Sequence, residues 1–426
     1  MECNDYPMDG YTDKAAILED ARKYWNPDKT DFWIDTGIPL VIGEREGYLF
    51  NDIDGKPFID MHLNGGTFNL GHRNPEIIAT LIDALGRVDI GNHHFPSAGR
   101  SRLAKMLIDS VPGGTMDKVV FGSSGGEVVD VAIKSARYAT GRKKIVSIVK
   151  AYHGHTGLSI ATGDERFLRL FKCNRPDEFV QVPFNDIDAM EQALSAGDVA
   201  AVIMETIPAT YGFPMPSPGY LAQVKALCER FGSLYIADEV QTGLGRTVDL
   251  WCFQHHGLTP DIVVTSKGLS GGIYPVSACI LNKKAAGWLS EDGFAHMATF
   301  GGSELGMQVG IKVLEITQRE STVNHVRELN DFYTSAFARL LADHPSLVEV
   351  RHDGMIAGLK FASADADAEP AVTFSKMLYD RGVWAIFSTL DKSVLQFKSG
   401  LLLPMNQAQT VIDRIDDALS ELDRAQ

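Results

Sequence analysis

Two short segments place charged side chains directly after predicted buried strands. Residues 234–246 (LYIADEVQTGLGR) predict an apolar strand that ends at Asp238, and residues 261–272 (DIVVTSKGLSGG) predict another that is followed by Lys267. Ligands of α/β sheets bind beyond the carboxyl ends of strands, and a lysine in a dry site can act as a Schiff-base amine. Taken singly, a structural carboxylate and a solvent-facing ammonium are the simpler interpretations.

A third segment, residues 121–137 (FGSSGGEVVDVAIKSAR), predicts a strand, a turn made by Ser124, Gly125 and Gly126, and an amphipathic helix. This order aims free backbone N–H groups and the positive end of a helix dipole at an anion, most naturally a phosphate. The turn matches neither a Walker motif nor GxGxxG, which argues against nucleotide binding.

A fourth segment, residues 151–157 (AYHGHTG), follows a predicted strand and contains Tyr152, His153 and His155. No carboxylate or cysteine completes a known ligand spacing with the two histidines, so the segment predicts no metal site. Stacking of Tyr152 on a planar ring is the functional interpretation, and ordinary core packing is the alternative.

The four signals together indicate one cofactor, pyridoxal phosphate. A lysine that forms the imine, an aspartate that keeps the pyridine nitrogen protonated, a loop for the phosphate and an aromatic for the ring are what this cofactor requires. Lys267 follows Asp238 by 267 − 238 = 29 residues. The protonated ring makes the cofactor an electron sink, so that a C–H bond beside the imine becomes acidic.

The elements that must position these residues form an α/β pattern. Between residues 71 and 320, short apolar runs alternate with helical stretches, which is typical of a large, mainly parallel sheet covered on both faces. Residues 1–70 contain a predicted hairpin around Asp54-Gly55, and residues 321–426 contain short strands and a C-terminal helix from about residue 407, with Asn406 as its N-cap. We expect both end segments to form a smaller α+β domain.

The composition of the chain argues against nucleic-acid-binding, membrane-spanning and secreted proteins. The 426 residues carry a net charge of −15 (40 − 55), so nucleic acids and anionic membranes are poor partners. No apolar run of about 18 residues predicts a membrane span, and no secretory signal is visible at the N-terminus. The five cysteines are scattered, which predicts free thiols and a cytoplasmic location; they are Cys3, Cys173, Cys228, Cys252 and Cys279.

In order along the chain, the motifs YLFNDIDGKPFID, LGHRNPEI, SSGGEVVDVAIKSAR, AYHGHTG, ADEVQTGLGRT, SKGLSGG and TFGG resemble those of the class III aminotransferases. The resemblance covers nearly the whole chain. It implies the α/β fold of fold-type I pyridoxal-phosphate enzymes and a homodimer with shared active sites, acting on a small-molecule amine.

The resemblance also implies roles for single residues. Lys267 would hold the cofactor and move a proton, and Asp238 would pair with the pyridine nitrogen. Thr299 would reach the phosphate bound by the neighbouring subunit. The full set of implied cofactor-binding residues is Ser124, Gly125, Gly126, Tyr152, Glu205, Asp238, Gln241, Lys267 and Thr299.

Two positions depart from the family pattern. Gln396, in VLQFKSGL, stands where many members have an arginine that binds the substrate carboxylate. Thr210, in METIPATYG, stands where ornithine- and GABA-type members have the glutamate that pairs with that arginine. A neutral glutamine lacks the bidentate grip of arginine, so dual-substrate recognition of that type is not expected. Another cation, such as Lys398 or Arg45, is the alternative carboxylate-binding residue.

Transamination of a small primary amine or amino acid is therefore the leading functional hypothesis. The segments ETIPA, QFK and YHGH are similar to members that eliminate phosphate or ammonia, so a lyase acting on a phospho- or phosphono-amino alcohol is the runner-up. A racemase or epimerase of the same fold and a catalytically silent paralogue are further alternatives. The presence of Lys267, Asp238 and Tyr152 argues against a catalytically silent protein.

Overall fold

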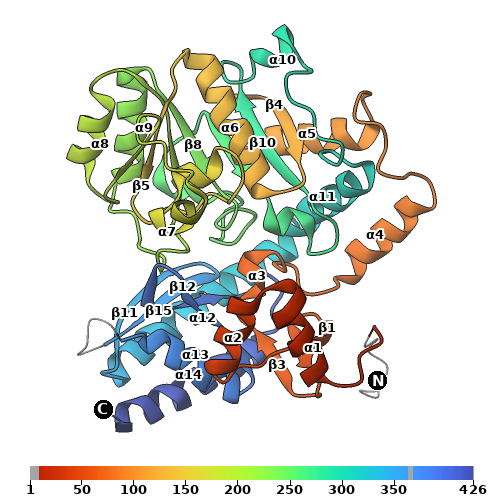
Figure 1. Ribbon diagram of the computed structural model, residues 1–426, viewed down its shortest axis with the longest axis vertical. Coiled ribbons are helices and arrows are strands. Elements are labelled where there is room, and N and C mark those ends of the chain that lie inside the picture. The colour runs from red at the N-terminus through yellow and green to blue at the C-terminus, as the bar shows by residue number, and fades with distance from the viewer. Residues whose placement is uncertain (1–8, 363–367, 426) are drawn as a thin grey trace.

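The computed structural model describes residues 9–362 and 368–425, which form two lobes (Figure 1). One lobe contains a seven-stranded sheet, and the other contains two four-stranded sheets made from both ends of the chain. Cys3 lies outside the described residues, and Cys173, Cys228, Cys252 and Cys279 are free thiols. In the described part of the chain, no helix combines the length and apolar character needed to cross a bilayer.

The seven-stranded sheet has the order β4-β10-β9-β8-β7-β5-β6. Its strand β10 is antiparallel to both neighbours, and the strands from β9 to β6 are parallel to one another. The strands are β4 Met116–Gly122, β5 Lys144–Ile148, β6 Phe179–Val182, β7 Val199–Glu205, β8 Leu234–Asp238, β9 Ile262–Thr265 and β10 Ser277–Asn282. The sheet is thus mainly parallel.

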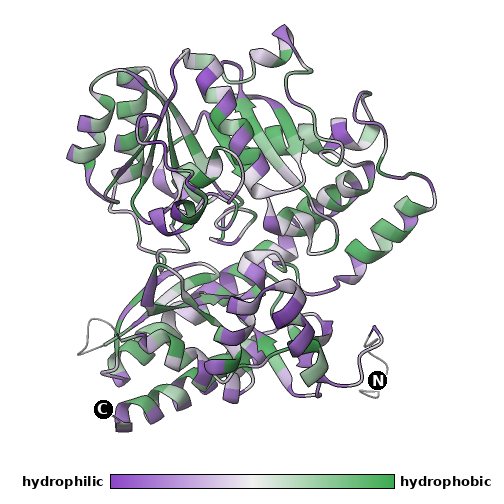
Figure 2. Ribbon diagram, in the orientation of Figure 1, coloured by the Kyte–Doolittle hydropathy of each residue, from purple (hydrophilic) through white to green (hydrophobic). Residues whose placement is uncertain are grey.

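Strands β7 and β8 are buried along their whole lengths, because helices cover both faces of the sheet. Figure 2 shows hydrophobic residues gathered along these central strands. The helices of this lobe are α4 Pro75–Leu85, α5 Ala98–Ser110, α6 Gly125–Thr140, α7 Glu165–Leu168, α8 Ile187–Leu194, α9 Tyr220–Phe231, α10 Trp288–Glu291 and α11 Glu304–Thr317.

The pairing register brings the polar ends of three strands together. Glu205 at the end of β7 pairs with Asp238 at the end of β8, and Asp238 pairs with Val264 of β9. Lys267 follows β9 by two residues. The carboxyl edge of the sheet therefore collects two carboxylates and a lysine that are far apart in sequence.

The other lobe contains the predicted hairpin, formed by β2 and β3 on either side of Asp54-Gly55. Its sheets have the orders β1-β2-β3-β13 and β11-β12-β15-β14. The strands are β1 Ile42–Glu46, β2 Leu49–Asp52, β3 Pro57–Asp60, β11 Leu347–Asp353, β12 Ile356–Phe361, β13 Val383–Trp384, β14 Ile386–Ser388 and β15 Asp391–Lys398. The helices are α1 Lys14–Asp20, α2 Pro27–Asp35, α3 Leu63–Gly66, α12 Glu320–Asp343, α13 Pro370–Asp380 and α14 Met405–Ala425.

The predicted start of the C-terminal helix was wrong by two residues. Helix α14 begins at Met405, so Asn406 lies in its first turn and is not the N-cap. The carbonyl of Pro404 accepts hydrogen bonds from the N–H groups of Gln407 and Ala408, at 2.9 and 3.0 Å, and this closes the first turn earlier than the side-chain pattern suggested.

Candidate active site

A cavity of about 300 Å³ lies at the carboxyl edge of the seven-stranded sheet. It is lined by Ser124, Gly125, Gly126, Tyr152, His153, Gly154, His155, Thr156, Glu205, Asp238, Val240, Gln241, Ser266 and Lys267. Eight of the nine residues implied to bind the cofactor are in this lining, and Thr299 is not. They come from the ends of five strands, β4, β5, β7, β8 and β9, so the sheet itself positions the site.

Lys267 begins a short 3₁₀ turn after β9, with φ of 38°, a left-handed conformation that is strained for a side chain with a Cβ. The hydroxyl of Ser270 donates to the Lys267 carbonyl at 2.6 Å and stabilises this turn. Burial lowers the pKa of the Lys267 ammonium below its usual value, although the Asp238 and Glu205 carboxylates oppose the shift. A neutral amine is the form that attacks a carbonyl carbon.

The carboxylate of Asp238 is held by groups of the cavity wall. Its Oδ2 lies 2.6 Å from Nδ1 of His153, and its Oδ1 accepts a hydrogen bond from the Val240 N–H at 3.1 Å. Both side chains are buried. His153 is the residue whose role the sequence did not reveal, because its partner is 85 residues away.

The neighbouring acid, Glu239, has the structural role that was the alternative for Asp238. Its carboxylate accepts hydrogen bonds from the Thr206 and Thr242 hydroxyls and from the backbone N–H groups of Cys252 and Phe253, at 2.5 to 3.1 Å. Successive side chains along an extended chain point in opposite directions. Asp238 therefore faces the cavity, while Glu239 binds the backbone and hydroxyl groups of the neighbouring loops.

Glu205 contributes a second carboxyl group to the cavity. Its oxygens accept from the backbone N–H groups of Tyr152 and Ala209, each at 3.2 Å. Burial raises the pKa of Glu205 to about 7. This carboxyl group therefore exchanges a proton near neutral pH.

The predicted phosphate cradle is the N-terminus of α6. The Ser124 hydroxyl caps this helix by accepting from the Glu127 N–H at 3.3 Å. A Cβ on Gly126 would lie 2.8 Å from the Thr156 hydroxyl oxygen, and one on Gly154 would lie 2.7 Å from the Gly126 Cα. Only glycines leave the backbone N–H groups open to the cavity here. The sequence missed Thr156, although it lies in the quoted segment AYHGHTG.

Aromatic rings form another wall of the cavity. The Tyr152 ring meets the rings of His155 and Phe167 edge to face, with centroids 5.1 and 5.5 Å apart. Burial raises the pKa of Tyr152, which keeps its phenol neutral. The stacking of Tyr152 on a planar ring stays a prediction, and the His155 ring is held by its contacts with Tyr152 and Phe167.

Five predicted residues lie outside the cavity lining. Thr299 is exposed in the loop before α11, so its implied reach to a neighbouring subunit stays a prediction. Gln396 and Lys398 are buried on β15, and the Thr210 carbonyl accepts from the Leu390 N–H at 3.2 Å. Arg45 is on β1, and its segment contributes to a different surface pocket.

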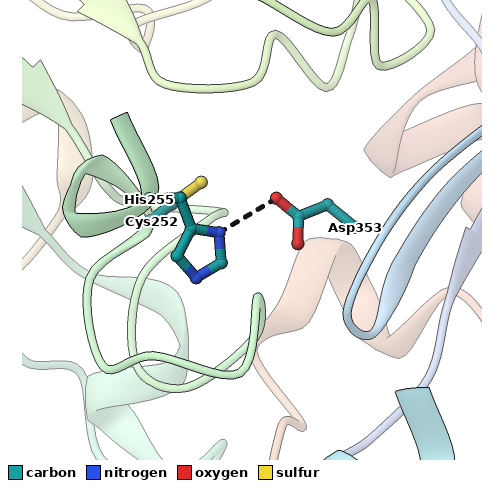
Figure 3. Close-up of side chains that lie close together, drawn as sticks. All are labelled: Cys252, His255 and Asp353. Carbon is teal, nitrogen blue, oxygen red and sulfur yellow. Dashed lines mark hydrogen bonds and ion pairs between the residues drawn. The ribbon is translucent and has the colours of Figure 1, made fainter. Parts of the chain in front are cut away.

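The described residues include one group with metal-ligating donors close together, formed by Cys252, His255 and Asp353 (Figure 3). His255 Nδ1 lies 3.3 Å from Asp353, and its Nε2 lies 3.1 Å from Asp249, so both ring nitrogens already face carboxylates. Burial raises the pKa of the Cys252 thiol well above its usual value, and the residue belongs to an apolar cluster with Ile207. We therefore interpret the group as an ion pair between His255 of one lobe and Asp353 of the other.

Comparison with known proteins decides the family. The family model described as aminotransferase class-III matches residues 34–419. The chain is a class III aminotransferase. This aminotransferase is 42% identical over 410 residues to a protein of Archaeoglobus fulgidus described as an uncharacterized aminotransferase, covering 96% of this chain and 95% of that protein.

Solved structures show the same fold as this class III aminotransferase. The ornithine aminotransferase of Toxoplasma gondii superposes with a TM-score of 0.89 at 23% identity, covering 98% of this chain and 97% of that one. The taurine:2-oxoglutarate aminotransferase of Bifidobacterium kashiwanohense, in complex with PLP and glutamate, superposes with a TM-score of 0.87 at 24% identity. The match covers 97% of this chain and 99% of that one. The acetylornithine aminotransferase of Elizabethkingia anophelis superposes with a TM-score of 0.82 at 26% identity, and the match covers 96% of this chain and 100% of that one.

The aminotransferase therefore has the fold-type I α/β architecture and is a transaminase that uses pyridoxal phosphate. The cavity fits this cofactor, because the Lys267 amine and the Asp238 carboxylate face one space that also contains the glycine cradle at α6. A Cβ at Gly126 would fill part of that cradle.

Proposed function

We propose that this aminotransferase removes the amino group from a small primary amine or amino acid and transfers it to a keto acid. When bound, pyridoxal phosphate supplies the aldehyde and an electron-accepting ring. The residues of the chain would supply the rest: Lys267 holds the cofactor and moves a proton at its Nζ, Asp238 holds a proton at the ring nitrogen, and the Gly125 and Gly126 N–H groups bind the phosphate.

The observation that carries this proposal is the position of Lys267 and Asp238 in one cavity beside the α6 N-terminus. Relatives named for ornithine, acetylornithine and taurine transamination support the reaction type. They do not identify the substrate, because Gln396 and Thr210 replace the family's arginine and glutamate.

The second candidate function is a lyase with the same cofactor and lysine, which would release ammonia or phosphate from a phospho- or phosphono-amino alcohol. A substrate panel with and without pyruvate and 2-oxoglutarate separates the two, followed at the cofactor's absorbance. A transaminase converts the cofactor to its amine form and stalls without a keto acid. A lyase turns over alone with an unchanged spectrum, and a racemase changes only the optical rotation.

We also propose a cytoplasmic homodimer in which Thr299 reaches the partner's phosphate site. The loop around Thr299 exposes Phe294, Met297 and Phe300, with 56–66% of each side chain accessible. Exposed apolar patches of this kind mark protein interfaces. Sedimentation velocity tests this: the wild type should sediment as a dimer, and Phe300→Asp should shift it towards the monomer. A monomeric wild type with bound cofactor would refute shared sites.

A further inference from the structure

Two fully buried basic side chains, those of Lys398 and Arg246, lie beside Lys267 without an acidic partner. Lys398 is 1% exposed and Arg246 is 2% exposed. Neither forms an ion pair within 4.0 Å with any acid of the described residues. Burial lowers the pKa of Lys398 well below its usual value, and the positive charges of Arg246 and Lys267 add to the shift. Buried charges are normally paired, and an anion bound here would pair with Arg246 and favour the ammonium form of Lys398.

Neutral groups hold both cations in place. Arg246 donates to Asn69 Oδ1 at 2.8 Å and to the Ser399 carbonyl at 3.3 Å. The Lys398 ammonium donates to Gln396 Oε1 and lies 5.5 Å from the centre of the Phe213 ring. These partners satisfy hydrogen bonds, but they do not neutralise charge.

The nearby acids are already engaged or favour the neutral form. Asp60 lies 2.8 Å from Nε2 of His72 in a buried pair. The raised pKa of Glu205, about 7, makes its carboxyl group partly neutral at neutral pH. In addition, Nδ1 of His62 is buried and has no hydrogen-bond partner among the described residues, and the charges of Lys398 and Lys267 both act on this ring. An incoming anion would have a polar partner in His62 as well.

These groups are close to the cavity. A Cβ built on Gly65 would lie 3.0 Å from Cε of Lys267, and one on the next residue, Gly66, would lie 2.6 Å from Nη2 of Arg246, so both side chains pack against the Gly65-Gly66 backbone. On the other side, Gln396 Nε2 donates to the Ala209 carbonyl at 3.0 Å, and the Ala209 N–H donates to Glu205, which lines the cavity.

We propose that Lys398, with Arg246 and His62, binds the acidic group of the amine substrate. The proposal deepens the proposed function, since it assigns the substrate class as amines that carry a carboxylate, sulfonate or phosphonate a few bonds from the nitrogen. Lys398 exchanges its contact with Gln396 for the anion, and it supplies the cation that Gln396 itself lacks. Lys398 is thus a specificity-determining residue.

The test compares Lys398→Met with Lys398→Arg, which keeps the charge, and with Lys392→Met. Lys392 is on the same strand but pairs with Glu369 near the surface, which makes it a matched control. The amines are 3-aminopropanoate, 2-aminoethanesulfonate and 2-aminoethylphosphonate, with 3-methylbutylamine as the uncharged isostere. Single-turnover rates are followed at the cofactor's absorbance in the holoenzyme, and cofactor content confirms folding.

For Lys398→Met we expect the preference for acidic over uncharged amine to fall by about 30-fold or more, as for a truncated buried charge pair. Lys398→Arg and Lys392→Met should keep most of that preference. The acid preferred by the wild type distinguishes a carboxylate from a phosphoryl substrate. An equal loss for both kinds of amine in Lys398→Met would overturn the assignment.

A binding measurement separates this inference from the proposed function. Calorimetric Kd values for propanoate, ethanesulfonate and ethylphosphonate report the anion site without any reaction. Binding that Lys398→Met weakens, together with no spectral change with any amine, would support the anion site and contradict transamination. If all three anions bind the wild type and Lys398→Met equally, or do not bind the wild type, the inference is wrong.

Discussion

The imidazole of His153 lies against the carboxylate of Asp238, with Nδ1 and Oδ2 2.6 Å apart. Both side chains are buried, and the second oxygen of Asp238 accepts from the Val240 N–H. The pair fixes the direction in which the carboxylate faces the cavity. His153 is therefore a positioning residue for Asp238.

Replacing Asp238 should lower kcat more than replacing His153. Asp238→Asn removes the charge that keeps a proton on the ring nitrogen, so kcat should fall by at least about 100-fold. His153→Ala leaves the carboxylate but not its orientation, and a loss of about 10- to 100-fold in kcat is expected. Steady-state kinetics across pH checks both. A purely structural His153 would instead change thermal stability and leave the pH profile unaltered.

The two glycines of the cradle should differ in their tolerance of a methyl group. A Cβ on Gly126 would lie 2.8 Å from the Thr156 hydroxyl, whereas one on Gly125 would lie 3.6 Å from its nearest neighbour, an ordinary contact. Overpacking costs about 1–3 kcal/mol, so Gly126→Ala should weaken cofactor binding by about 10-fold or more. Fluorescence titration of the apoprotein with pyridoxal phosphate measures this. Equal Kd values for Gly125→Ala and Gly126→Ala would contradict it.

The carboxyl group of Glu205 should make stability depend on pH. Its folded pKa, about 7, is above the usual 4.5, so the folded state binds more protons than the unfolded state between these values. Stability contributed by this group therefore falls as pH rises through that window, by up to roughly 3 kcal/mol. Denaturant unfolding of the apoprotein should show this fall for the wild type relative to Glu205→Gln. Parallel pH profiles for the two proteins would refute the raised pKa.

The ion pair between His255 and Asp353 should make stability depend on pH in the same direction as Glu205 does, but at higher pH. Asp353 raises the pKa of His255 by hydrogen bonding, against the effect of burial. The contribution of this pair is fully present below the unfolded value of 6.5 and is lost as pH rises through the raised folded pKa. His255→Gln should lower Tm by a few degrees at acidic pH and hardly at all at pH above about 9. A deficit of the same size at both pH values would argue that the ring acts only by packing.

Local patterns predicted the elements that carry the site. Unbroken apolar strands ending in Asp238 and in the Lys267 segment indicated a covered sheet with a functional edge, and parallel strands necessarily bring such ends together. The anion-binding turn at Ser124 was also predictable, because the first turn of a helix that follows a strand has backbone N–H groups without intrahelical partners. The hairpin around Asp54-Gly55 also followed from its turn residues.

Contacts between distant segments were beyond such patterns. Either acid of the Asp238-Glu239 dipeptide could have faced the cavity, and only the contacts of Glu239 with Thr206 and Cys252 distinguish them. The closeness of Lys398 to Arg246 depends on how the two lobes pack, which local periodicity does not encode. The start of α14 was misplaced because a backbone carbonyl, that of Pro404, closes the first turn.

The central claim is that Lys267 holds the cofactor, and reductive trapping tests it most directly. The holoenzyme is reduced with borohydride, which fixes the cofactor to the amine that binds it, and the labelled peptide is mapped by mass spectrometry. The label should be found on Lys267, and Lys267→Ala should take up none while keeping its circular dichroism spectrum. A label on another lysine, or full turnover by Lys267→Ala, would contradict the account.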